Sequence, residues 1–502
     1  MAHYLSDEEL TRTAPAEVAA FASPVPTQIV SNGEFVPLPQ TREQQRVEAR
    51  IKEMADGLGP RHGMDRRRFL ASSAGMAAAF LAMNEVFGPL FDVSPAEAQT
   101  PGVANQRAGA LSKQFVIDVQ THFVRDDFDK EGLLGLGKYA SEHWNPDMLK
   151  DIPLVLQRYK FQNYLKEIYL DSDTKVALLS GAPFDDPAWD LLTNDQIAMA
   201  RASINKISGS RRLLAHSVIT PKRAGWMDEV DRCIATVKPD SWKGYTIGDP
   251  LFPSKQQSYW RLDDDKLMYP FYEKISKAGI NTICIHKGLL PADYEKSWPG
   301  VWEYNTVWDV GKAAKDWPKI NFVIYHAALR PFLEKPDEAM AEFDRTGRMQ
   351  WATDLAEIPA KFGVKNVYGE VGTAFANSAV ANPRFAAAFM GTLMRGLGTD
   401  RVLWGTDSVW YGSPQWQIEA MRRLEIPADM QKKHGFAPLG AADGPVKTAL
   451  FTRNAARLYH IDVKTAQGAI PGDKVGAIKA EYVRLGGLRS NTRYGYVHRV
   501  SA

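Results

Sequence analysis

The chain has 502 residues, 45% of them hydrophobic and 24% charged, and its 61 lysines and arginines nearly balance 59 aspartates and glutamates. A formal net charge of +2 leaves no basic surplus for neutralising phosphates, which excludes nucleic-acid binding as the main task. The two cysteines, Cys233 and Cys284, cannot build a disulfide scaffold or a four-cysteine zinc site. This composition is typical of a globular enzyme or of a protein that binds small molecules.

The first predicted element is an export signal over residues 66–98. Arg66 and Arg67 open it, an uncharged stretch of small and apolar residues follows over 71–83, and a small-x-small cleavage site ends at Ala98. An arginine pair, an apolar stretch of about fifteen residues and such a site are the parts of a secretory signal. The stretch is too short for a stable membrane span, which needs about twenty residues. The segment resembles a bacterial twin-arginine signal, the type that exports folded proteins.

We therefore predict that residues 1–98 form a long leader, unstructured or helical, that the twin-arginine export machinery recognises. The expected location is the periplasm or outside a bacterial cell, with cleavage after Ala98. The alternative is an N-terminal helix that lies on the folded body, in which case the protein stays in the cytoplasm.

From about residue 114, eight short β-rich apolar runs alternate with longer helical patterns. This alternation predicts an α/β fold, a distorted (β/α)8 barrel with loop insertions and a C-terminal tail, as the single domain of residues 99–502. A doubly wound open sheet is the alternative, but no glycine-rich dinucleotide turn and no phosphate-loop motif is present. The predicted strands are 115–121, 175–180, 213–219, 244–247, 281–286, 321–326, 366–371 and 402–407.

Polar residues stand at the ends of several predicted strands. His122, His286 and His326 are three of the ten histidines, and Asp407 ends the last strand. In a barrel, the loops at the C-terminal ends of the strands surround one shared pocket, so these side chains should converge. Zinc binds imidazole and carboxylate at about 2.0–2.2 Å and lowers the pKa of a bound water to about 7. We predict one divalent metal ion held by His122, His286 and Asp407, with His326 or Asp407 as acid or base.

At these residues the chain resembles the amidohydrolase superfamily, and specifically the amidohydrolase-related group that includes aminocarboxymuconate-semialdehyde decarboxylase. The resemblance covers roughly residues 115–461 and depends on the order of the motifs and their positions on strands one, five, six and eight. The matching segments are VIDVQTH at 116–122, CIH at 284–286, VIYH at 323–326, LWGTD at 403–407 and RNAARLY at 453–459.

The resemblance implies a mononuclear metal site with one altered position. His122 matches the second histidine of the family's His-x-His pair, but Gln120 stands where the first histidine is expected. A glutamine oxygen is a weaker, neutral ligand, so the implied ion is zinc or the harder manganese, or the site holds none. His286 matches the strand-five ligand and His326 the strand-six histidine. Asp407 matches the strand-eight aspartate.

Three residues are weaker candidates for substrate binding. Lys243 is predicted to hold a substrate carboxylate or to be an exposed lysine, and His143 to line the pocket from a loop. Glu370 is predicted to be a second acid or base, or a carboxylate paired with a barrel cation. Tryptophans in the loops would suit an aromatic or cyclic substrate; they are Trp298, Trp302, Trp308 and Trp410.

Three functions remain open at this point. The first is hydrolysis of an amide, lactone or related carbonyl compound by metal-activated water, with Asp407 or His326 moving the proton. The second is non-oxidative decarboxylation of an aromatic or unsaturated carboxylic acid, with the same two residues handling the proton. The third is a non-catalytic barrel that has lost its metal because of Gln120. The expected partner is a small molecule, and a homo-oligomer is possible.

Overall fold

The computed structural model describes most of the 502-residue chain. The residues it describes are 13–15, 23–30, 37–125, 160–182, 190–247, 258–289, 294–297, 299–330, 336–487 and 496–498.

Eight parallel strands form the centre of the molecule, in the spatial order β2-β3-β4-β5-β6-β7-β8-β9. The first and last strands also meet, because the N–H of Val119 donates to the carbonyl of Trp404 and Thr121 bridges to Ser408. This nearly closed sheet confirms the predicted (β/α)8 barrel. The strands are β2 (Val116–Thr121), β3 (Thr174–Leu179), β4 (Leu213–Val218), β5 (Ser241–Tyr245), β6 (Thr282–His286), β7 (Asn321–Tyr325), β8 (Val367–Glu370) and β9 (Val402–Leu403).

Two strands differ from their predicted bounds by more than one residue at an end. β5 spans Ser241–Tyr245, so it begins before its predicted start at 244, and its charged residue Lys243 is fully buried in mid-strand. β9 ends at Leu403, short of the predicted end at Asp407. Asp407 has φ 58°, a left-handed conformation that a strand cannot continue through.

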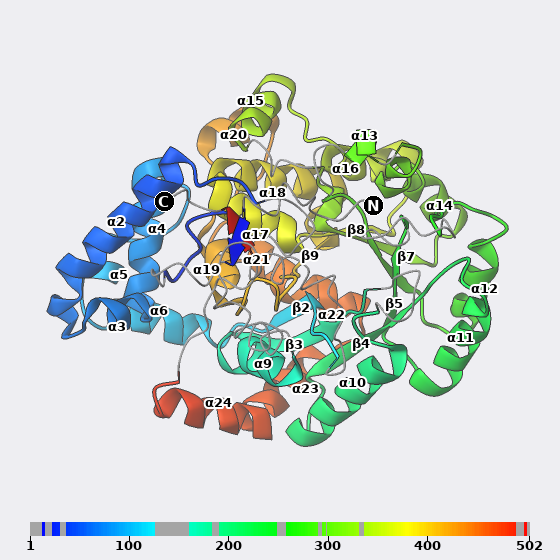
Figure 1. The fold of residues 1–502 in the computed structure, drawn as a ribbon, viewed down its shortest axis with the longest axis horizontal. Helices are drawn as coiled ribbons and strands as arrows, with labels where there is room; N and C mark the ends of the chain where they lie inside the picture. Colours follow the sequence, from blue (N-terminus) through cyan, green and yellow to red (C-terminus); the bar gives the residue numbers. More distant parts are fainter. Residues whose placement is uncertain are drawn as a thin grey trace.

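Helices connect the strands and cover the outside of the barrel (Figure 1). A capping box of Thr193 and Gln196 begins α10, and Gly209, with φ 79°, caps its C-terminal end. The helices of the barrel are α9 (Phe161–Leu165), α10 (Asn194–Ser208), α11 (Trp226–Arg232), α12 (Tyr269–Lys277), α13 (Tyr294–Ser297), α14 (Val310–Asp316), α15 (Pro336–Thr346), α16 (Ala352–Phe362), α17 (Gly372–Ala381), α18 (Pro383–Leu397), α19 (Gln415–Arg423), α20 (Ala428–His434), α21 (Pro445–Thr448), α22 (Asn454–Leu458), α23 (Val463–Ala469) and α24 (Lys474–Arg484).

The interior of the barrel is an apolar core closed by the C-terminal helices. Strand residues such as Val119, Leu214 and Val323 pack in one cluster with Leu458 and Tyr459, in and just after α22. Because this apolar plug fills the barrel, the polar ends of the strands are left to form a site at its other opening.

The N-terminal segment is helical and packs on the barrel. Figure 1 shows its helices grouped on one side of the molecule; they are α2 (Arg42–Leu58), α3 (Arg66–Leu70), α4 (Ser73–Phe87), α5 (Pro95–Gln99) and α6 (Val103–Leu111). The apolar stretch of the predicted signal forms α4, whose N-cap Ser72 accepts a hydrogen bond from the N–H of Gly75. Within the described ranges, none of the helices has the length and apolar character needed to cross a membrane. A two-stranded sheet pairs β1 (Thr13–Pro15) with β10 (Tyr496–His498).

Candidate active site

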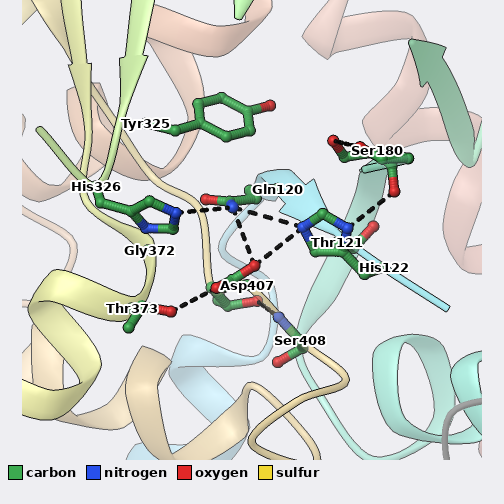
Figure 2. Close-up of polar contacts among 12 residues, drawn as sticks. Gln120, Thr121, His122, Ser180, Tyr325, His326, Gly372, Thr373, Asp407 and Ser408 are labelled. Atoms are coloured by element: carbon green, nitrogen blue, oxygen red, sulfur yellow. Dashed lines mark hydrogen bonds and ion pairs between the residues drawn. The ribbon is translucent and has the colours of Figure 1, made fainter. Parts of the chain in front are cut away.

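Gln120 lies at the point where the predicted site residues converge (Figure 2). It is the fifth residue of β2 and is buried. Its amide nitrogen donates a hydrogen bond to Asp407 Oδ1 over 3.0 Å. The same nitrogen lies 3.4 Å from Nε2 of His326 and 3.5 Å from Nε2 of His122. Four side chains from three strands therefore surround one small volume, as the barrel geometry predicts.

His122 follows β2 directly and faces oxygen atoms with both ring nitrogens. Nδ1 lies 2.9 Å from the carbonyl of Ser180, and Nε2 lies 3.0 Å from Asp407 Oδ1. The ring stacks on Trp410 at 5.6 Å between centroids. A backbone carbonyl on one nitrogen fixes the orientation of the ring, which is the usual arrangement for a histidine that presents its other nitrogen to a ligand.

Asp407 is held in the ionised state. Burial opposes ionisation, but hydrogen bonds from His122 and Thr373 and the charges of His122 and His326 outweigh it and lower the pKa of Asp407 to about 2. Its backbone N–H donates to the carbonyl of Gln120 over 2.9 Å, which ties the loop after β9 to β2.

His326 follows β7 and begins a left-handed turn. His326, Ala327 and Ala328 have φ values of 59°, 45° and 53°. Each such residue costs about 1–2 kcal/mol, and strain of this kind is concentrated at functional sites. The turn is held in part by Glu370, which accepts the N–H of His326 over 3.1 Å.

The imidazole of His326 is neutral at pH 7. Burial is the main cause, and it lowers the pKa of His326 to about 3 together with the charges of Lys243 and His122, although Asp407 acts in the opposite direction. Nδ1 of His326 has no hydrogen-bond partner within the described part of the site. This nitrogen is therefore the one able to meet a substrate.

His286 lies next to His326. Its ring stacks on Tyr245 at 4.5 Å and meets the edge of the His326 ring at 4.8 Å. Burial is the main cause that keeps the pKa of His286 well below its usual range, and the neighbouring His326 and Lys243 act in the same direction. The role of His286 as a metal ligand stays a prediction.

The donor set fits a divalent ion only if Gln120 takes part through its oxygen. Among the described residues, no three His, Cys, Asp or Glu side chains form a group that could hold a metal ion. Oε1 of Gln120 is buried and accepts no hydrogen bond from the described residues. If the side-chain amide of Gln120 were turned over, its oxygen would take the place of its nitrogen beside His122 Nε2 and Asp407 Oδ1, two atoms that lie 3.0 Å apart. About 3 Å is the spacing of neighbouring ligands around an ion bound at about 2.1 Å. His122, Asp407 and the rotated Gln120 are thus the residues that fit an ion.

Two fully buried carboxyl groups lie behind the site. Glu370 accepts the N–H of Gly372 over 2.6 Å, and burial raises the pKa of Glu370 to about 8. Asp118 accepts hydrogen bonds from the N–H of Gln120 and from Thr406, and burial raises the pKa of Asp118 to about 7. Both oxygens of Glu370 accept backbone N–H groups, so the residue supports the site, and pairing with a barrel cation does not describe it.

Lys243 is a buried cation beneath the histidines. Its ammonium lies 3.6 Å from the centre of the Tyr325 ring and 4.9 Å from that of Tyr245. Its charge lowers the pKa of both His286 and His326. The alternative of an exposed lysine was wrong, because the residue points into the barrel from β5 and is 0% exposed.

Sequence reasoning missed Thr373, whose hydroxyl donates to Asp407 and contacts the hydroxyl of Tyr411. A threonine in the first turn of α17 belongs to no motif, so the sequence contains no signal for it. His143 and Trp298 lie outside the described residues. Trp308 is 54% exposed, whereas Trp410 stacks on His122 and belongs to the site.

One family pattern matches most of this chain. The amidohydrolase family matches residues 117–461. This range contains all the predicted strands, except for the first two residues of the strand predicted over 115–121. No curated protein sequence matches the chain.

Solved structures with a similar chain path include several decarboxylases. 2,6-Dihydroxybenzoate decarboxylase from Rhizobium is 13% identical and covers 70% of this chain and 99% of its own, with a TM-score of 0.41. 5-Carboxyvanillate decarboxylase from Sphingomonas paucimobilis is 14% identical and covers 69% of this chain and 99% of its own, with a TM-score of 0.40. 5-Carboxyvanillate decarboxylase from Novosphingobium aromaticivorans, crystallised with manganese, is 16% identical, with coverages of 70% and 97% and a TM-score of 0.42. The family assignment rests on the sequence match and not on these structures.

Proposed function

This chain belongs to the amidohydrolase family and is an enzyme of hydrolase or carboxy-lyase type, and from that premise we propose that it removes the carboxyl group of an aromatic or unsaturated carboxylic acid without an oxidant. The observation that carries this proposal is the buried ammonium of Lys243 beneath His286 and His326. Its positive charge lowers the pKa of both histidines, and the same charge attracts the carboxylate of an acid that binds next to them. The site therefore favours an anionic substrate.

The walls of the site suit a flat substrate. The indole of Trp410 stacks on His122, and the phenol of Tyr245 stacks on His286. Aromatic faces of this kind pack against planar rings in offset or edge-on arrangements. Together with the buried ammonium, they favour a planar acid as the substrate class.

His326 and Asp407 handle the proton in this proposal. A substrate carboxylate within about 4–6 Å raises the pKa of an imidazole, so His326 takes up a proton from solvent as the acid binds. The C–CO2 bond then breaks, and its electron pair ends in a new C–H bond formed with the proton on Nδ1 of His326. Carbon dioxide leaves and His326 returns to the neutral state. Ionised Asp407 stabilises the imidazolium while it exists.

A divalent ion at His122, Asp407 and Gln120, either zinc or manganese, would supply positive charge that holds an anionic oxygen of the substrate. His122 is oriented for this by the carbonyl of Ser180, and Asp407 by Thr373. These two side chains keep their positions through the protein's own hydrogen bonds.

Hydrolysis is the second candidate, and the protonation states favour it. Neutral His326 and ionised Asp407 are both in the form that accepts a proton, so they can activate water before any substrate carboxylate is present. The substrate would then be a lactone, an amide or a related carbonyl compound.

Product analysis in D2O distinguishes the two reactions. We expect hydroxylated benzoic acids and unsaturated acids, tested with added Zn2+ or Mn2+, to release carbon dioxide and to gain one deuterium at the carbon that lost it. Lactones and amides should be inert. Turnover of lactones or amides with no carbon dioxide from any acid would contradict the proposal and support hydrolysis.

A matched pair of variants tests the role of His326. His326→Asn should lower kcat by about 10²–10⁴, the usual contribution of a general acid or base. His460→Asn is the control, because His460 is exposed and its φ of 52° is close to the 59° of His326. Asparagine tolerates this backbone conformation at both positions. Unchanged turnover in His326→Asn would exclude His326 as the proton donor.

A further inference from the structure

The segment that the sequence marks as a removable leader is built into the folded body. Ala98, after which cleavage is predicted, is 0% exposed in α5. Its neighbour Glu97 makes a 2.7 Å ion pair with Arg423 of α19, and both side chains are buried. Because Ala98 is buried and lies in a helix, a protease that cuts after it must first undo these contacts.

Backbone hydrogen bonds continue the contact on the N-terminal side of Ala98. The N–H of Asp92 donates to the carbonyl of Arg423 over 2.7 Å, and the N–H of Glu425 donates to the carbonyl of Leu90 over 2.8 Å. Phe91 bridges to Leu424 in antiparallel fashion. Residues 90–92 therefore pair with the chain that ends α19.

The apolar stretch of the predicted signal packs against the same region. In α4, nine residues from Ala74 to Met83 are buried. The ring of Phe80 is fully buried, lies 4.9 Å from the ring of Phe91 and is covered by the guanidinium of Arg423 at 5.5 Å. The stretch is thus an interior helix of the folded protein.

Two helices connect this N-terminal segment to the active site. At its beginning, α17 places Thr373 on Asp407, and near its end the carbonyl of Val380 accepts a hydrogen bond from Gln44 of α2. Val380 also lines a small cavity with Met83 and Phe87 of α4.

The second connection is α19. Near its start, the side chain of Gln417 donates to the carbonyl of Thr406, the residue before Asp407, over 3.1 Å. Its last residue is Arg423, which Glu97 holds. Both helices that support Asp407 therefore have their far ends covered by residues 42–99.

We propose that helices α2 to α5 remain part of the working enzyme as a brace for the active site, and that the chain is not cut after Ala98. The brace fixes α17 and α19, and through Thr373 and Gln417 it fixes the loop that carries Asp407. This inference does not depend on the reaction that the site catalyses.

The brace is compatible with export of the folded protein, which we also propose. Arg66 is exposed at the surface, where it pairs with Asp56 of α2, and Arg67 and Arg68 are exposed beside it. The arginine pair stays accessible while the apolar stretch is docked.

The mass of the protein from the producing cells tests whether the leader is kept. We expect intact-mass spectrometry of the folded protein, from the periplasmic and the cytoplasmic fraction, to show a chain that still contains residues 42–99. A folded, stable species that begins at Gln99 would overturn the proposal.

A cut made on purpose tests whether the segment is a brace. A specific protease site inserted in the exposed turn at 100–102, between α5 and α6, allows cleavage of the folded full-length chain. We expect the two fragments to co-elute in size-exclusion chromatography, with hydrogen exchange in α17 and α19 as slow as in the uncut control. Release of the N-terminal fragment, with exchange and melting temperature of the barrel unchanged, would overturn the brace. Neither readout uses a substrate, so failure of the proposed decarboxylation leaves this test intact.

Discussion

Gln120 decides how the site can be used, because its carboxamide can present either of two atoms to the same place. In the structure the NH2 group faces Asp407 and the two imidazoles, and it adds one hydrogen bond to those that Asp407 receives from His122 and Thr373. An ion needs the oxygen there instead. Binding therefore requires loss of the Gln120–Asp407 hydrogen bond, which weakens the site for any ion relative to one built from three charged or imidazole ligands.

Replacement of Gln120 by histidine should strengthen metal binding. Gln120→His supplies an imidazole beside His122 and Asp407 and removes the competing amide. We expect the affinity for zinc to rise by about tenfold or more, the order that even indirect changes around a metal produce. Metal content by mass spectrometry, after dialysis against equal zinc and manganese, measures it. The control is Gln45→His on the exposed surface of α2; equal zinc contents in the two variants would contradict the role of Gln120.

Glu370 should make the protein less stable as the pH rises. Its pKa is about 8 in the folded chain, so between its ordinary value of 4.5 and 8 the native state holds a proton that the unfolded state has lost. The free energy of unfolding then falls by up to about 1.4 kcal/mol per pH unit in that window. Asp118, with a pKa of about 7, contributes in the same direction between 3.8 and 7.

The variant Glu370→Gln should therefore flatten this dependence. Chemical denaturation at pH 5, 6, 7 and 8 should show a smaller fall in stability with rising pH. The share of Asp118 remains, as does the opposite contribution of the buried histidines His286 and His326 below pH 6.5. The absolute stability should fall, since glutamine can accept only one of the N–H groups of His326 and Gly372. Glu357→Gln, on the surface beside Arg348, is the control. If the stability of Glu370→Gln depended on pH as steeply as that of the unaltered protein, Glu370 would not be the group that holds the buried proton.

At the scale of elements, the site depends on a left-handed turn that packs against another backbone. The turn at His326–Ala328 follows β7, and Gly288 lies against it from the loop after β6. A Cβ at Gly288 would lie 2.4 Å from the carbonyl carbon of Ala328, and its φ is +79°. Backbone atoms cannot move aside as a flexible side chain can, so only glycine fits this position.

Gly288→Ala should displace the turn that presents His326. We expect a loss of more than about 2 kcal/mol, since the left-handed backbone alone costs an alanine about 1–2 kcal/mol and the contact with Ala328 adds to it. Gly279→Ala isolates the backbone part, because Gly279 has φ +73° and a Cβ added there would have nothing within 4 Å. Denaturation curves of the two variants measure the difference. Equal losses would mean that the Gly288–Ala328 contact is unimportant.

At the scale of the whole molecule, the barrel and the N-terminal helices form one packed body. The pair Glu97–Arg423 joins them, with both side chains less than 10% exposed. A broken buried pair costs about 3–5 kcal/mol because a charge is left without its partner. Arg423 also lies 3.4 Å from Glu419, which should keep the loss near the lower end of that range.

Glu97→Gln should therefore lower the free energy of unfolding by roughly 3 kcal/mol. Glu85→Gln is the control, since Glu85 pairs with Arg50 within the N-terminal segment and both side chains are partly exposed. Such a pair contributes about 0–1 kcal/mol. Urea denaturation, followed by tryptophan fluorescence of the barrel, measures both. A loss in Glu97→Gln no larger than in the control would show that the two parts are not energetically coupled there.

The sequence alone determined the barrel and the convergence of most residues predicted for the site. Alternating apolar runs require strands and helices in turn, and the ends of parallel strands meet at one opening, so His122, His326 and Asp407 could be assigned to a common site from the residues alone. The exact ends of β5 and β9 could not be predicted, because a buried lysine and a left-handed aspartate break the local pattern.

Only the tertiary structure decided the rest, since these features depend on contacts between residues far apart in the chain. It turned the Gln120 amide toward Asp407, placed His286 beside His326, and brought Thr373 from α17 onto the carboxylate. It also buried α4 against Arg423, although the composition of α4 is equally that of an export signal. An apolar helix has the same sequence pattern whether it packs on a membrane receptor or on its own barrel, and only the partner surface distinguishes the two.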